Sequence, residues 1–153
     1  MRNMYVTTQF SIFMVNKPGV LAKVLGEFAR AKINIVAVTM MDSVEHGVMR
    51  VIFAETKRAK KIIPKLSMPY HEAEVLCVNL TNEPGALAMV AEKLAREHIN
   101  ISYAYCTAGA KGGRTTGVLK VADVNKAMKV LQPKGQKTGR SRPVIRRSKA
   151  SKK

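Results

Sequence analysis

The sequence is poor in cysteine and contains no long apolar run. Its two cysteines, Cys77 and Cys106, stand in apolar stretches without a CxxC or Cys/His pattern, so neither a zinc site nor a disulfide framework is expected. We expect two buried free thiols in a reducing cytoplasm. The run Phe10–Val15 is too short for a signal peptide or a membrane span, and Lys17-Pro18-Gly19 interrupts it. A membrane partner is therefore not expected.

The sequence also lacks recognisable catalytic motifs. No Ser/His/Asp set, paired carboxylates or metal-ligand cluster emerges, so we expect no enzyme activity, no cofactor and no metal. His46, His71 and His98 lie in loop-like or helix-end surroundings that favour structural or solvated roles. The glycine-rich stretch Gly109–Gly113 lacks the GxxxxGK[ST] spacing, so it is not expected to hold phosphate.

Acidic residues are scarce, with 10 Asp and Glu against 27 Lys and Arg, and the net charge is +17. Residues 133–153 have no acid and nine cations: Lys134, Lys137, Arg140, Arg142, Arg146, Arg147, Lys149, Lys152 and Lys153. We predict a disordered basic tail, with 143–147 as its one candidate strand. Such a tail can bind nucleic acid or another polyanion. It has no aromatic residue to stack on bases, so a solubilising tail or a tether to an acidic partner is an equal alternative.

A seven-residue stretch occurs twice. Asn16-Lys17-Pro18-Gly19-Val20-Leu21-Ala22 recurs 66 positions later as Asn82-Glu83-Pro84-Gly85-Ala86-Leu87-Ala88. An apolar, strand-like run precedes each copy, and a helix-like run followed by Ile-Asn-Ile (33–35 and 99–101) comes after it. This repetition predicts two units with the same supersecondary structure. Units of this size bury too little surface alone, so they should pack together or in an oligomer.

Each unit is predicted to run strand, helix, strand, strand, helix, weak strand. In the first unit the expected elements are a strand over 5–15, a helix from Pro18 to about 31, strands over 33–41 and 48–54, and a helix over 57–66 capped by Thr56. A weak strand over 70–74 ends the first unit. In the second unit the expected elements are a strand over 75–80, a helix over 84–97, strands over 99–107 and 115–121, and a helix over 124–131 capped by Asp123.

This order predicts an α+β protein with two ferredoxin-like βαββαβ sandwiches in tandem. We place the domains at 5–72 and 73–132 and the basic tail at 133–153. The open sheet faces and edges invite a second copy of the chain, so a homodimer is expected. Phe13 interrupts the polar face of its strand and is a candidate contact residue, whereas Met40, Met41 and Met49 are expected to fill the core or an interface.

The repeated turn has the chemistry of a ligand site. A helix N-terminus offers free N–H groups and partial positive charge to a carboxylate. Gly19 and Gly85 remove a side chain where a ligand would approach the backbone, and Asn16 or Asn82 can donate and accept hydrogen bonds. The alternative is structural, because Asn is a good turn residue beside Pro-Gly and Gly allows close helix–strand packing.

Two further asparagines, Asn34 and Asn100, stand between isoleucines at the start of the second strand of each unit. Asn is depleted in strands, which favours a binding role. The alternative is that each satisfies the helix–strand loop. The two turns differ in charge, because copy one has Lys17 where copy two has Glu83. If only one turn binds an anionic ligand, the Lys17 turn is favoured electrostatically.

The motif Asn-x-Pro-Gly-x-Leu at the first strand–helix turn, with Ile-Asn-Ile opening the second strand, resembles the ACT domain. Its occurrence twice in a βαββαβ context makes residues 5–131 similar to tandem ACT proteins. The resemblance implies a regulatory protein that senses a small molecule, usually an amino acid, and acts on a partner such as a biosynthetic enzyme.

The resemblance also implies where a ligand binds, namely between the turn of one unit and the second strand of its neighbour. The residues concerned are Asn16, Lys17, Pro18, Gly19, Val20, Leu21, Asn34 and Ile35 in copy one, and Asn82, Pro84, Gly85, Ala86, Leu87, Asn100 and Ile101 in copy two. One binding pattern in the family has a His two residues before the turn Asn. Met14 and Leu80 stand there in this chain, so a serine-type binding mode is not expected.

Overall fold

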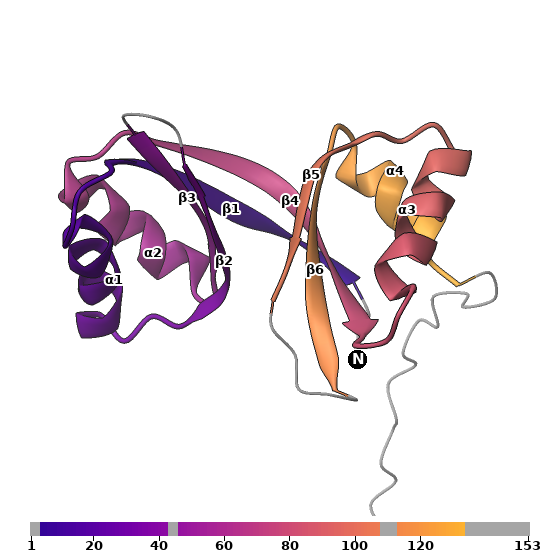
Figure 1. The fold of residues 1–153 in the computed structure, drawn as a ribbon, viewed down its shortest axis with the longest axis horizontal. Helices are drawn as coiled ribbons and strands as arrows, with labels where there is room; N and C mark the ends of the chain where they lie inside the picture. The colour runs from indigo at the N-terminus through magenta and orange to yellow at the C-terminus, as the bar shows by residue number, and fades with distance from the viewer. Residues whose placement is uncertain (1–3, 43–45, 108–112, 134–153) are drawn as a thin grey trace, which may run out of the picture.

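The computed structural model describes residues 4–42, 46–107 and 113–133, and it confirms an α+β protein of two similar units in tandem (Figure 1). The elements are β1 (Met4–Val15), α1 (Val20–Arg30), β2 (Ile35–Asp42), β3 (His46–Phe53), α2 (Thr56–Ile62) with a 3-10 turn η1 (Ile63–Leu66), β4 (Tyr70–Thr81), α3 (Ala86–Arg96), β5 (Ile101–Cys106), β6 (Arg114–Val121) and α4 (Val124–Leu131). Within the described ranges, no helix is long and apolar enough to cross a membrane.

The six strands form one antiparallel sheet in the order β2-β3-β1-β4-β6-β5. Its centre is a ribbon of two 12-residue strands, β1 and β4. Met4 pairs with Val78 and Ile12 pairs with Tyr70, so that Thr8 faces Glu74, its own counterpart 66 positions later. The pairing is therefore symmetric about this point, and an approximate twofold axis relates copy one, which begins with β1, to copy two, which begins with β4.

Each central strand takes part in both units. Met4–Ile12 of β1 pair with β4, and Phe10–Val15 pair with β3, so Phe10–Ile12 have partners on both sides. The strands predicted separately at 70–74 and 75–80 are one continuous strand, because β1 supplies hydrogen-bonding partners across their junction. Copy two thus receives a strand from the N-terminal half of β1. The candidate strand at 143–147 and the rest of the tail lie outside the described residues. The division at 72 and 73 falls inside β4 and stays a prediction.

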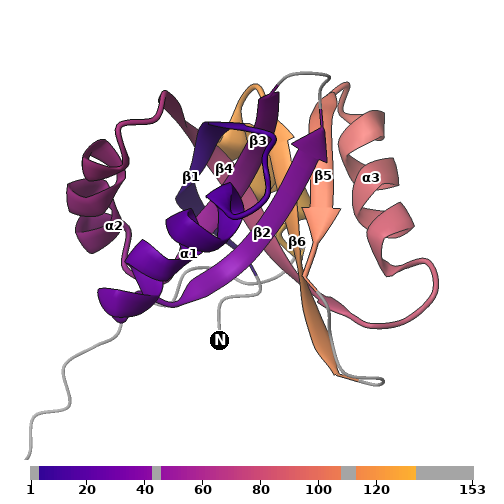
Figure 2. The ribbon, with the colours of Figure 1, turned by 60° about the vertical axis from the view of Figure 1, so that its left-hand side comes forward.

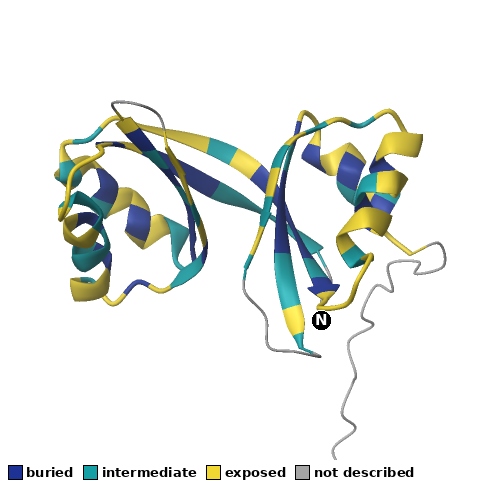
Figure 3. Cartoon of the chain, viewed as in Figure 1, coloured by how far each residue is buried: buried dark blue, intermediate teal, exposed yellow. Residues whose placement is uncertain are grey.

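The four α-helices in the described part of the chain cover one face of the sheet. Phe10, Ile12 and Met14 of β1 are buried in a cluster with Val24 and Phe28 of α1. In the second cluster, the equivalent residues of β4 (Leu76, Val78 and Leu80) pack with Val90 and Leu94 of α3. This is the predicted alternation along each strand, meeting the predicted apolar stripe on each helix. Figures 1 and 3 show the helix pairs on the two outer flanks, with buried strand positions between them.

The helix-free face of the sheet also buries side chains, because the sheet curls and brings β2 and β3 toward β5 and β6 (Figure 2). A third apolar cluster joins both copies across this face: Ala37, Ile52, Val75, Cys77 and Val118. Burial raises the pKa of the Cys77 thiol above its usual range. Cys77 is buried as predicted, but the prediction for Cys106 is wrong, because Cys106 ends the edge strand β5 and is exposed.

Beside this cluster lies a polar group that we call the polar clasp: Gln9, Arg50, Tyr103 and Tyr105. The Gln9 Nε2 donates to the Tyr103 hydroxyl at 2.7 Å, and the Tyr105 hydroxyl donates to Gln9 Oε1 at 2.9 Å. The Arg50 guanidinium lies 3.9 Å from the centre of the Tyr103 ring. Gln9 is fully buried, whereas its counterpart in copy two is the apolar Val75. The contact between the two copies is therefore polar on one side of the twofold axis and apolar on the other.

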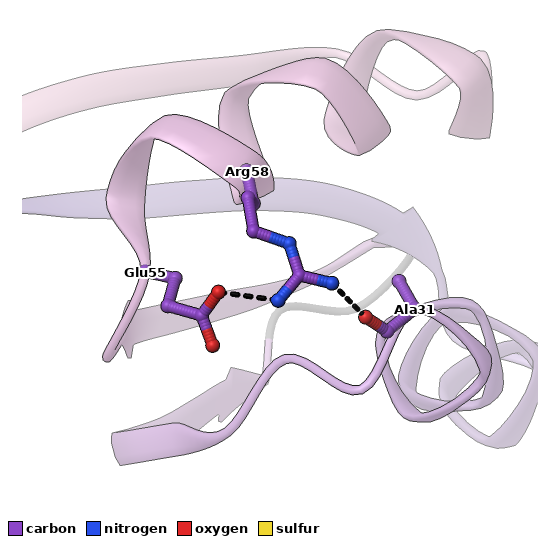
Figure 4. A network of polar contacts seen from close by, with 3 residues as sticks. All are labelled: Ala31, Glu55 and Arg58. Atoms are coloured by element: carbon purple, nitrogen blue, oxygen red, sulfur yellow. Dashed lines mark hydrogen bonds and ion pairs between the residues drawn. The ribbon is translucent and has the colours of Figure 1, made fainter.

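Helix ends agree with the sequence in part. The predicted cap Asp123 accepts a hydrogen bond from the Lys126 N–H at 2.9 Å. The predicted cap Thr56 is wrong: Glu55 occupies the cap position, since its carbonyl accepts from the Arg58 N–H at 3.0 Å, and Thr56 is already helical. The Arg58 side chain contacts the Glu55 carboxylate and the Ala31 carbonyl beyond the end of α1 (Figure 4). This contact ties the two helices of copy one together.

Candidate functional site: the two strand–helix turns

Both turns place a glycine in the left-handed region directly before the helix. Gly19 has φ 88° before Val20, and Gly85 has φ 85° before Ala86. The predicted helix starts at Pro18 and Pro84 are therefore two residues too early. Among the residues that the structure describes, none has an atom within 4 Å of a Cβ added to either glycine. The glycines are needed for the positive φ and not for close helix–strand packing, and the space beside them is open.

The helix N-termini at these turns have no side-chain cap. The first regular helical bonds are from the Lys23 N–H to the Gly19 carbonyl at 2.9 Å and from the Met89 N–H to the Gly85 carbonyl at 3.0 Å. Before them, the Val20 N–H donates to the Lys17 carbonyl and the Ala86 N–H donates to the Glu83 carbonyl, each at 3.3 Å. The remaining N–H groups of the first turn lie where partial positive charge accumulates. Each turn thus presents main-chain donors suited to an anionic group.

A hollow lies beside each turn. The hollow at turn one measures about 350 Å³ and is lined by Phe13, Met14, Val15, Val20, His46, Leu66, Ser67, Met68 and Pro69. The hollow at turn two measures about 300 Å³ and is lined by Met4, Val78, Asn79, Leu80, Thr81, Ala86, Met89, Val90, Lys93, Leu131 and Pro133. Twofold-related residues occur in both linings: Met14 and Leu80, and Val20 and Ala86. The two hollows are therefore copies of one feature.

Met14 and Leu80 occupy the positions where the serine-type pattern has a His, and both line their hollows. An apolar side chain replaces the imidazole at each site. That the binding mode is not the serine type stays a prediction. The linings are mainly apolar, and the residues that precede each helix are exposed.

The linings include polar residues that the sequence did not indicate, and two of these have ionisable side chains. Lys93 lines the hollow at turn two, and His46 lines the hollow at turn one. Lys93 could have been found from spacing, because it lies seven residues after Ala86 and so falls on the same helix face. Its counterpart in copy one is Glu27, which forms an ion pair with Arg30. No comparable sequence signal indicated His46, which reaches the hollow only because β3 lies beside β1.

Asn16 connects turn one to the sheet. Its Nδ2 donates to Asp42 Oδ1 at 3.2 Å, which places the C-terminal end of β2 beside the turn. In copy two, the Asn82 N–H donates to the Gly113 carbonyl at 3.0 Å, so turn two contacts the start of β6. Lys17 and Glu83 are exposed at their turns. The first asparagine of the predicted site therefore lies next to a carboxylate.

The other predicted residues lie away from the turns of their own copies. Asn34 and Asn100 are exposed and precede β2 and β5, which begin at Ile35 and Ile101. Each stands beyond the C-terminal end of an 11-residue helix, so about 16 Å of helix separates it from its turn. The Asn34 carbonyl accepts from the Ala54 N–H at 3.0 Å and so closes the helix–strand loop. The end of β2 reaches the turn of its own unit, but Asn34 and Asn100 can meet a turn only in a different unit.

Comparison with known proteins adds a family match. The family model described as the ACT domain pair matches residues 4–137. No curated protein matches the chain. The solved structure of protein BT0572 from Bacteroides thetaiotaomicron is similar with a TM-score of 0.76 and 29% identity, over 84% of this chain and 88% of that chain.

Two structures of aspartate kinase components have a similar fold at lower identity. The ligand-free regulatory subunit of aspartate kinase from Thermus thermophilus has a TM-score of 0.59 and 13% identity, over 83% of this chain and 93% of that chain. Aspartokinase III from E. coli, in complex with lysine and aspartate, has a TM-score of 0.52 and 19% identity, over 86% of this chain and 31% of that chain. The second likeness thus spans about a third of the kinase.

Proposed function

The chain belongs to the ACT domain pair family, and from this premise we propose that it is a non-enzymatic regulatory protein that binds an amino acid at its strand–helix turns. The observation that carries the proposal is the duplication of one arrangement: an uncapped helix N-terminus, a glycine with positive φ and an adjacent hollow. The aspartokinase III complex with lysine and aspartate supports an amino acid as the ligand class.

The chemistry of turn one fits each part of an amino acid. The carboxylate would accept from the first-turn N–H groups of α1 that follow Val20, where the helix dipole and Lys17 favour an anion. The ammonium group would lie by Asp42, whose carboxylate already accepts from Asn16. The side chain would enter the hollow of about 350 Å³, which lies at the small end of the range for ligand pockets. Its apolar lining favours an aliphatic side chain.

A charge exchange between the two turns tests this function. Thermal unfolding of the full chain is measured with each of the twenty amino acids at millimolar concentration. A ligand at 100 times its Kd stabilises the native state by about 2.7 kcal/mol. We expect Lys17→Glu to weaken binding of the active amino acid at turn one. The matched variant Glu83→Lys makes the opposite change at turn two and should not weaken it.

The proposal fails if none of the twenty amino acids raises the melting temperature. It also fails if Lys17→Glu and Glu83→Lys leave the shift of an active amino acid unchanged, because binding would then occur elsewhere. Both residues are exposed, so neither substitution should lower the stability of the ligand-free protein by more than about 0.5 kcal/mol.

The relay to a partner is part of the same proposal. Binding would favour one packing of the two copies, and a partner enzyme in the cytoplasm would respond to that packing. Affinity purification of the full chain with and without the active amino acid would reveal such a partner, since a relay requires ligand-dependent co-purification.

The alternative function is polyanion binding through the nine cations of residues 133–153, with the ACT pair as a scaffold. Electrophoretic mobility shifts with nucleic acid at two salt concentrations test it, using the full chain and a chain ending at 132. Salt-dependent binding that disappears with the tail supports this function. Absence of binding by the full chain at low salt rules it out.

A further inference from the structure

The helices of the two copies differ in charge. In copy one, the helices and their flanking turns, residues 16–32 and 55–65, contain nine cations and two acids, a net charge of +7. The equivalent residues of copy two, 82–98 and 123–133, contain four cations and four acids. The helices correspond pair by pair, α1 to α3 and α2 to α4, so the contrast is due to side chains. We call residues 16–32 and 55–65 the basic layer.

Most cations of the basic layer are not neutralised. Three of the nine form an ion pair with a glutamate, namely Arg30, Arg58 and Lys60. Repulsion between like charges opposes the compact state, and a bound anion would relieve it. The other six are exposed lysines without an ion pair to any described residue: Lys17, Lys23, Lys32, Lys57, Lys61 and Lys65.

The unpaired lysines extend across both helices. α1 and α2 lie side by side on the outer flank of copy one (Figures 1 and 2). The Arg58 side chain contacts the Ala31 carbonyl, so Lys32 lies beside the first turn of α2 (Figure 4). Lys57 and Lys61 stand on one face of α2, about 6 Å apart along its axis. This arrangement suits an extended ligand with repeated negative charges.

The basic layer has the composition of a nucleic-acid interface and not of a protein interface. None of the eight exposed large hydrophobic side chains among the described residues lies on α1, α2 or η1, whereas Leu87 and Met89 lie on α3. Protein interfaces are depleted in Lys and enriched in aromatic residues and Met, whereas interfaces with DNA are much more positively charged. The one aromatic residue of the layer, Phe28, is buried and cannot stack on bases. Contacts are therefore limited to phosphate groups.

We propose that the basic layer binds the phosphate backbone of a nucleic-acid duplex without sequence preference. A duplex carries about one negative charge per 1.7 Å of its axis, so several lysines of the layer contact phosphates at once. The site lies on folded copy one and is separate from the nine cations of residues 133–153. It does not rest on amino-acid binding, and Lys17 is the one cation that belongs to both the layer and turn one.

Charge-matched variants of the full chain test this site. The layer variant combines Lys57→Gln, Lys61→Gln and Lys65→Gln, and its control in copy two combines Arg96→Gln, Lys126→Gln and Lys129→Gln. Binding of a labelled, mixed-sequence DNA duplex is followed by fluorescence anisotropy at several salt concentrations. Each phosphate contact contributes about 0.9 to the slope of log K against log salt concentration. We expect the slope to be smaller by about 2.7 in the layer variant and unchanged in the control.

Several outcomes would overturn the proposal. Absence of binding by the wild-type chain at low salt is one. An unchanged slope in the layer variant is another, because the tail alone would then account for binding. An equal loss in both variants would mean that net charge and not the basic layer is responsible. Tighter binding of poly-L-glutamate than of the duplex would identify an acidic protein as the partner instead.

Folding and the amino-acid site are controlled separately. All six substituted side chains are exposed, and circular dichroism verifies that both variants fold. Neither variant changes turn one, so both should keep the thermal shift of an active amino acid. A wild-type chain that binds the duplex but shows no amino-acid shift refutes the proposed function and leaves the nucleic-acid site standing.

Discussion

The polar clasp gives the most direct test of how the two copies hold together. Replacement of Gln9 by Val installs the residue that copy two has at the equivalent position, Val75. It removes the acceptor of the Tyr105 hydroxyl and the donor to the Tyr103 hydroxyl. Because Gln9 is fully buried, water cannot take the place of its amide without repacking.

The expected loss follows from the two hydroxyls. Leaving a buried polar group without its partner costs about 1–3 kcal/mol. Tyr103 and Tyr105 are both half-buried, and Tyr105 packs against the third cluster. We therefore expect Gln9→Val to lower the free energy of unfolding by about 2–3 kcal/mol. For a chain of this length, each kcal/mol corresponds to about 2–4 °C in Tm. The melting temperature should fall by about 4–12 °C.

Urea unfolding measures this loss, with Gln132→Val as control because Gln132 is exposed. The double variant Gln9→Val/Tyr105→Phe should lose less stability than the sum of the losses in the two single variants. Both substitutions remove the same hydrogen bond, from the Tyr105 hydroxyl to Gln9. A loss below about 0.5 kcal/mol for Gln9→Val would refute the reasoning. It would mean that a valine, as at Val75, stabilises the contact between the two copies as well as Gln9 does.

Three further outcomes follow from the described contacts. Asp123→Ala should cost about 1 kcal/mol in urea unfolding, because α4 loses its cap. Gly85→Ala should also lower the free energy of unfolding by about 1 kcal/mol, because φ is 85° at this position. Gly26→Ala inside α1 should instead raise it by about 0.5–1 kcal/mol. Changes of the same sign in the two variants would contradict this account. Burial raises the pKa of Tyr5 to about 12 and also raises that of Cys77, so the unfolded chain loses these protons first. Thermal stability should therefore be complete below about pH 8.5 and fall as the pH rises toward 12, with a shallower fall in Cys77→Val.

Features determined within a few residues were predicted well. The helix stripes, the alternation along β1 and β4 and the cap at Asp123 depend on contacts between near neighbours in the sequence. The errors concern the first residues of two helices, where main-chain geometry and not the side chain decides which residue begins the helix. α2 starts at Thr56 because the Glu55 carbonyl takes the capping position, and α1 starts after Gly19 because Pro18 belongs to the turn.

The candidate site shows the same division. The repeat identified both turns, their glycines and their asparagines from residue type and spacing alone. The hollows could not be predicted, because each is formed by segments far apart in the chain. His46 comes from β3, and Leu131 from α4. The separation of Asn34 from turn one also needed the structure, since it depends on the direction in which α1 runs.

The sequence by itself determined two copies of one unit, the elements within each and the turn that each unit repeats, because hydrophobic period, glycine and proline act locally. Only the tertiary structure decided that β1 and β4 pair about a twofold axis and that each central strand serves both units. Strand pairing joins residues more than sixty positions apart, and many registers satisfy the same alternation. The same long-range pairing brought Gln9 to Tyr105, a contact that no local pattern reveals.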